Sequence, residues 1–171
     1  MTAVGEGDIY DSGAAVPRDQ ARLAVDEIEV KLRRVLHDVL HSHLGEDYWK
    51  SALPGDLQTK IKERVSERNR SKIVIRIEDP LIRLQYADIM DLYKILDKNW
   101  DLFKDRFGSR EALKSHFLAL KNYRNPLGHI RDLDVVEQKQ GETAIIWFRR
   151  ALDAPVDSNS VPDAGQEETT A

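Results

Sequence analysis

Apolar side chains recur through the middle of the chain in the three- and four-residue steps of amphipathic helices. The first stripe, in 18–43, consists of Val25, Ile28, Leu32, Val35 and Val39, widened by Leu36 and Leu40. Acidic residues come early in this segment and basic residues late, and Gly45 follows it. The pattern predicts a long helix that opens at Pro17 and ends before Gly45.

Four further segments carry the same periodicity. Asp56 is a candidate cap for a second helix, in which Leu57, Ile61 and Val65 recur at steps of four. The longest apolar face lies in 81–107 and includes Ile89, Leu92, Leu96, Trp100, Phe103 and Phe107. These aromatic residues indicate core packing rather than a platform for stacking bases.

The last two helices enclose a short polar stretch. Ser109 can cap a helix over 110–123, which should stop near Arg124 because Asn125 precedes Pro126. A final helix is expected from Asp132 or Asp134 to Leu152, burying Val135 or Val136 together with Ile145, Phe148 and Leu152. Gly141 weakens the middle of that helix by roughly 1 kcal/mol relative to alanine.

Only Ser71–Asp79 has strand-like alternation, at Ile73, Ile75 and Ile77. A lone strand has no partner in the chain, so we expect an extended segment packed on helices, or pairing with a second copy. The sequence therefore predicts an all-α bundle of about five helices over 18–152.

The charge distribution separates the ends from the middle. The chain of 171 residues has a formal net charge of −4, but residues 1–17 and 153–171 hold eight of its 30 acidic residues and none of its 26 basic ones. Both ends lack apolar periodicity, so we expect two disordered acidic tails. The middle is then net +4, which permits RNA binding without indicating it.

Cysteine is absent, which excludes disulfides, thiol catalysis, thiolate zinc sites and iron–sulfur clusters. No apolar run is long enough to span a membrane, and the N-terminus does not resemble a secretory signal. We therefore expect a cytoplasmic protein with no membrane partner.

The polar stretch 121–131 carries the most promising chemistry. Arg124 and His129 are separated by four residues, which form a stiff turn that contains Pro126 and Gly128. Arginine suits phosphate oxygens, and histidine can take or give a proton near neutral pH. These are the abilities that RNA cleavage by 2′-hydroxyl attack requires, so the chemistry needs no metal and no cofactor.

The stretch Arg124-Asn125-Pro126-Leu127-Gly128-His129 resembles the R-N-x-x-x-H form of the R-x4-6-H signature of the HEPN superfamily. The preceding segments Tyr86–Leu92 and Asn99–Phe103 are similar to the HEPN type attached to a nuclear mRNA-surveillance endonuclease and to its stand-alone bacterial relatives. The resemblance is strongest in 80–152.

This resemblance implies a HEPN-like bundle that acts as a metal-independent endoribonuclease. It further implies a homodimer in which two Arg–His motifs form one composite site, with Arg124 and His129 catalytic and Asn125 orienting them or the phosphate. Lys121 and Arg131 are expected to bind RNA. Phage defence or a toxin role, with a neutralising or regulatory protein partner, follows from the resemblance alone.

One departure and several alternatives accompany this interpretation. Toxin HEPN proteins silenced by nucleotidylation carry a tyrosine two residues after the histidine, where this chain has Arg131. Some HEPN domains are non-catalytic and bind RNA, nucleotide or a partner protein. Arg124 and His129 could also cap helix ends and pair with Asp132 or Asp134.

Other polar clusters have simple explanations. His37, His41 and His43 invite a metal interpretation, but Arg33 and Arg34 beside them favour a solvated helix face. His116 is expected on a helix surface, and Trp147 at a half-exposed position open to a dimer interface. The basic run Arg68, Asn69, Arg70 and Lys72 indicates a solvated helix end, with RNA or partner contact as the alternative.

Overall fold

The protein is built from helices. A computed structural model describes residues 16–70, 78–127 and 134–154. Its elements are α2 (Arg18–Leu44), α3 (Tyr48–Ala52), α4 (Gly55–Asn69), α5 (Pro80–Gln85), α6 (Ile89–Lys98), α7 (Trp100–Phe107), α8 (Arg110–Leu127) and α9 (Val135–Asp153). The all-α prediction is confirmed, but these ranges hold eight helices where about five were expected.

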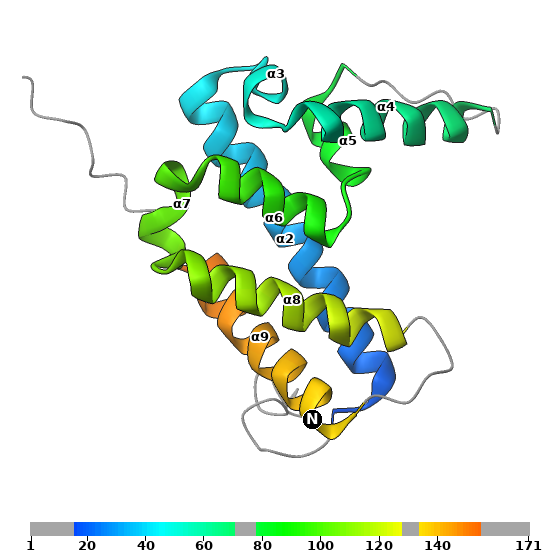
Figure 1. The fold of residues 1–171 in the computed structure, drawn as a ribbon, viewed down its shortest axis with the longest axis vertical. Helices are drawn as coiled ribbons and strands as arrows, with labels where there is room; N and C mark the ends of the chain where they lie inside the picture. Colours follow the sequence, from blue (N-terminus) through cyan, green and yellow to red (C-terminus); the bar gives the residue numbers. More distant parts are fainter. Residues whose placement is uncertain (1–15, 71–77, 128–133, 155–171) are drawn as a thin grey trace, which may run out of the picture.

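The helices pack around the α8–α9 pair. α8 and α9 run antiparallel in close contact, and α2 passes behind α8 and contacts both helices (Figure 1). α6 packs on α8 and α2, and α7 contacts α8 and α9. In Figure 1, α4 extends away from this group beside α5. The C-terminal end of α8 and the N-terminal ends of α9 and α2 therefore lie at one end of the molecule.

The core lies where α2, α6, α8 and α9 meet. Its fully buried side chains include Ile28, Leu32, Leu36, Leu92, Ile95, Phe117, Leu120, Ile145 and Phe148. α2 follows its predicted bounds to within one residue, but its buried stripe is shifted: Leu36 and Leu40 are fully buried, whereas Val35 and Val39 are half-buried. The face of α2 that turns inward is thus rotated slightly from the expected one.

The expected single helix over 81–107 is divided into three by polar caps. The Asp79 carboxylate accepts a hydrogen bond from the Leu81 backbone at the start of α5. Asp88 and Asp91 form a reciprocal capping box that starts α6. Asn99 ends α6 and donates its side-chain amide to the carbonyls of Ala52 and Ile95, at 3.0 and 2.7 Å.

Two details of the helix ends also differ from expectation. The predicted cap at Asp56 is wrong, because α4 begins at Gly55 with Pro54 in the cap position. The prediction that Val135 or Val136 is buried is also wrong: they are 69% and 59% exposed. Val136 lies on the side of α9 opposite Ile145, and Val135 is the first residue of the helix, six residues before its first buried position at Gly141.

Ser109 does cap α8, since its hydroxyl accepts a hydrogen bond from the Ala112 backbone at 3.2 Å. The isoleucine alternation at 73–77 and nearly all of both predicted tails lie outside the described residues. None of the described helices combines the length and hydropathy needed to cross a bilayer.

Candidate functional site

Three of the five predicted site residues lie on the last two turns of α8. Lys121 precedes Arg124 by three residues and Asn125 by four, so all three share one side of the helix. Arg124 and Asn125 are exposed, and Lys121 is half-buried. His129 and Arg131 lie outside the described residues.

α8 continues past the point where it was expected to stop. The predicted end near Arg124 is wrong, because the helix runs to Leu127 and includes Pro126. Proline at 126 removes only the backbone hydrogen bond to the Asn122 carbonyl, one residue before the helix ends. A residue that precedes proline disfavours helical dihedral angles, and Asn125 is such a residue. Tertiary contacts of Tyr123 and Arg124 keep the last turn of α8 helical in spite of this preference.

Tyr123 fixes the end of α8 against α9. Its side chain is 1% exposed, and its ring packs on the backbone of Gly141. A methyl group at position 141 would overlap that ring. Gly141 is therefore the residue that lets α9 approach the turn carrying Arg124, a role that helix propensity does not reveal.

Arg124 forms an ion pair with a buried acid on α2. Its Nε lies 2.7 Å from Oε1 of Glu29, whose side chain is 6% exposed, while Arg124 keeps 44% of its own side-chain surface exposed. The contact joins opposite charges without the alignment of a hydrogen bond. Glu29 thus holds the Arg124 side chain at the surface of the helix end.

Glu29 is itself held by Arg33. The other carboxylate oxygen, Oε2, accepts a hydrogen bond from Nη2 of Arg33 at 3.0 Å. Arg33 also donates to the carbonyls of Leu84 and Ala87, at 3.0 and 3.1 Å. The buried carboxylate is therefore flanked by two guanidinium groups, one of them anchored to the α5–α6 junction.

This arrangement provides a positioned cation at the end of α8. A guanidinium has five N–H donors in a planar fork, and an ion pair at Nε restricts its rotation. Carboxylate and phosphate oxygens are the ligands that such a group prefers. Asn125 and Lys121, on the same side of α8, add an amide and an ammonium beside it.

Sequence reasoning missed Glu29. The sequence suggests Asp132 or Asp134 as acidic partners of Arg124, whereas in the structure Arg124 contacts Glu29. Glu29 stands directly beside the apolar stripe of α2 and four residues before Arg33. That spacing could have indicated an acid–arginine pair at the edge of the core, although not its third partner.

The histidines of α2 lie elsewhere. Nδ1 of His37 is 3.1 Å from the hydroxyl of Tyr48, and the rings of His37 and His41 stack with centroids 5.5 Å apart. Burial raises the pKa of the Tyr48 hydroxyl, and the charges of Asp79 and Asp38 add to this. In the described residues, no three His, Asp or Glu side chains cluster as metal ligands.

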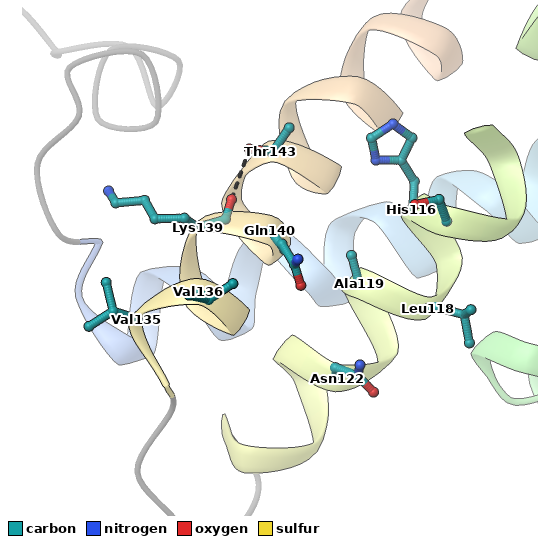
Figure 2. Close-up of a pocket in the computed structure, with 10 residues that line it drawn as sticks. His116, Leu118, Ala119, Asn122, Val135, Val136, Lys139, Gln140 and Thr143 are labelled. Carbon is teal, nitrogen blue, oxygen red and sulfur yellow. Dashed lines mark hydrogen bonds between the residues drawn. The ribbon is translucent and has the colours of Figure 1, made fainter. Parts of the chain in front are cut away.

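His116 and Trp147 form an aromatic contact between α8 and α9. Their ring centroids are 4.4 Å apart and nearly parallel, and Trp147 also stacks on Phe107. Burial lowers the pKa of His116. His116 also lines a groove of about 560 Å³ between the two helices, which sequence reasoning did not anticipate (Figure 2).

No protein-family model matches this sequence, and no curated protein or solved structure matches it. The assignment of chemistry therefore depends on the residues themselves.

Proposed function

We propose that this chain is a metal-independent endoribonuclease of HEPN type that acts as a homodimer. The observation that carries the proposal is the Arg124–Glu29 ion pair, which positions a half-exposed guanidinium five residues before His129. Catalysis of phosphoryl chemistry depends mainly on positioned positive charge and on proton transfer. In the proposed site Arg124 supplies the positive charge and His129 the proton transfer.

The proposed reaction follows from these groups. His129 removes the proton of a ribose 2′-hydroxyl, and the 2′-oxygen attacks the adjacent phosphorus. Arg124 stabilises the negative charge of the pentacoordinate phosphorane. The partner's His129 protonates the departing 5′-oxygen, which leaves one product with a 2′,3′-cyclic phosphate and the other with a 5′-hydroxyl.

The remaining predicted residues have supporting roles in this proposal. Asn125 orients the phosphate or the Arg–His pair, and Lys121 and Arg131 bind flanking phosphates. We place the protein in the cytoplasm, in phage defence or as a toxin, with a neutralising or regulatory partner protein. No cofactor takes part in the reaction.

The test is a ribonuclease assay on the full chain in EDTA. Wild type should cleave single-stranded RNA and leave cyclic phosphate ends, whereas Arg124→Ala and His129→Ala should each lose at least about a hundredfold in rate. Arg34→Ala and His43→Ala are matched controls at exposed positions of α2 and should cleave normally. A requirement for magnesium would contradict the mechanism.

A second candidate function is a non-catalytic HEPN module that binds RNA, nucleotide or a partner protein. The observation that favours it is the same ion pair, because Arg124 already has a structural partner in Glu29. If wild type binds RNA and leaves it intact, and Arg124→Ala chiefly lowers the free energy of unfolding, this second function replaces the first.

A further inference from the structure

The groove between α8 and α9 has the chemistry of a site for a planar heterocycle. Its volume, about 560 Å³, lies within the range of small-molecule sites. Leu118 and Ala119 of α8 and Val136 of α9 form apolar walls. Figure 2 shows Gln140 reaching from α9 toward α8, where Ala119 and Asn122 lie. Apolar walls with two amides at their edges match the faces and the hydrogen-bonding edge of a nucleobase.

The charge of the groove also suits part of a nucleic acid. Among the described residues that line it there is no Asp or Glu, although the chain as a whole is net negative. Lys139 lies at its margin, paired with Glu142 at 3.0 Å, and extends away from the groove in Figure 2. A base could therefore enter without meeting a carboxylate in these walls.

The groove connects to the candidate site around the end of α8. At 3.6 residues per turn, Lys121, Asn125 and Asn122 lie about 60°, 100° and 160° around the helix from Arg124. Arg124, Asn125 and Asn122 are exposed and Lys121 is half-buried. These four polar side chains form a continuous path from the positioned guanidinium to the groove, and a single strand crossing the helix end would follow it.

We propose that the α8–α9 groove binds a base of the RNA substrate, near the phosphate that Arg124 engages. This inference rests on the proposed function and adds to it a subsite for base recognition. Asn122 and Gln140 read the edge of the base, and Leu118, Ala119 and Val136 contact its faces. The groove then contributes to the choice of the nucleotide near the cleaved bond.

The test measures binding of fluorescent single-stranded oligonucleotides of A, C, G or U to the full chain carrying His129→Ala, which prevents cleavage. Adding Gln140→Ala or Asn122→Ala should weaken binding of the preferred base about fivefold or more and reduce the differences among the four bases. Gln85→Ala, at an exposed position of α5, is the matched amide control and should change neither quantity. Photocrosslinking of thio-substituted RNA should label peptides containing Leu118 or Gln140.

The outcomes separate this inference from the proposed function. If Arg124→Ala weakens RNA binding but the two amide variants change neither affinity nor base preference, the groove is not a base subsite, while the proposed function stands. If the amide variants change the oligomeric state instead, as measured by light scattering, a second copy covers the groove and the inference is wrong. If wild type neither binds nor cleaves RNA, both proposals are wrong.

Discussion

Gly141 shows how one residue can be unfavourable for its helix and yet favour the packing of that helix on its neighbour. Gly141→Ala should gain up to roughly 1 kcal/mol of helix propensity but lose more through overlap with Tyr123, for a net loss of about 1–3 kcal/mol in the free energy of unfolding. Chemical denaturation measures this change. Gly55→Ala is the matched control, because a methyl group there meets nothing within 4 Å. Equal stability of wild type and Gly141→Ala would contradict the close contact.

Glu29 is the second residue whose role depends on tertiary contacts. Glu29→Gln keeps the shape of the side chain but leaves Arg33 and Arg124 without their shared negative charge. We expect a loss of about 1–3 kcal/mol in the free energy of unfolding and a lower cleavage rate, since Arg124 is no longer held in place. Denaturation and the ribonuclease assay measure the two effects.

The matched control for Glu29→Gln is Glu46→Gln, at an exposed position near the end of α2. Full activity of a folded Glu29→Gln variant would show that the ion pair does not position Arg124.

The motif itself could be recognised in the sequence, because Arg124, Asn125 and His129 are close together in it. Glu29 could not, since it lies nearly a hundred residues away and only the packing of α2 on α8 brings it to Arg124.

At the scale of the helices, periodicity predicted where they lie better than where they end. The apolar positions of 81–107 keep the same helical spacing on both sides of Asp88 and Asn99. They therefore indicate one helix where the structure has three. The breaks come from polar side chains that bind free backbone groups. Asp88 and Asp91 have the spacing of a capping box, so the break before α6 could be predicted from the sequence. The contact of Asn99 with the Ala52 carbonyl, at the end of α6, could not.

The same box ties α4 to α6 through four charges. Arg64 lies 3.1 Å from Asp88 and 2.9 Å from Asp91, and Lys60 contacts both acids. Burial acts to raise the pKa of Asp88, but hydrogen bonds from the Asp91 backbone and from Arg64, with the charge of Lys60, outweigh it and lower the pKa to about 2. This cluster attaches α4, which extends from the rest of the molecule, to the start of α6.

The lowered pKa of Asp88 predicts a specific dependence of stability on pH. The unfolded carboxyl, with its ordinary pKa near 3.8, binds protons more readily than the folded one, so stability is present above about pH 4 and is lost as pH falls toward 2. Asp88→Asn keeps the cap but loses the charge. It should cost at most about 1 kcal/mol at pH 5, because the partly exposed pair is screened by solvent.

Urea denaturation between pH 2 and 5 measures this difference. The gap in stability between wild type and Asp88→Asn should shrink as the pH falls below 4. Asp101→Asn, at a side chain that is 93% exposed, is the control and should show no such convergence. A gap that stays constant down to pH 2.5 would show that the Asp88 charge does not stabilise the fold.

At the scale of the whole molecule, the arrangement of helices places Arg124 at an end of the fold where the ends of three helices lie together. The C-terminal end of α8 and the N-terminal ends of α2 and α9 lie there together. Each chain contributes only one His129 to the motif, whereas the proposed reaction uses one base and one acid. A second copy of the chain is the simplest source of the second imidazole, and this requirement leads to a quantitative prediction.

Mixing wild type with His129→Ala should reduce activity more steeply than dilution does. If both chains of a dimer must supply His129, an equal mixture after subunit exchange retains about one quarter of the wild-type rate, because only that fraction of dimers is fully wild type. Independent sites would retain about one half. Initial cleavage rates at several mixing ratios and constant total protein distinguish a quadratic decline from a linear one. Mixing with His43→Ala should leave the rate unchanged, and a linear decline with His129→Ala would rule out the composite site.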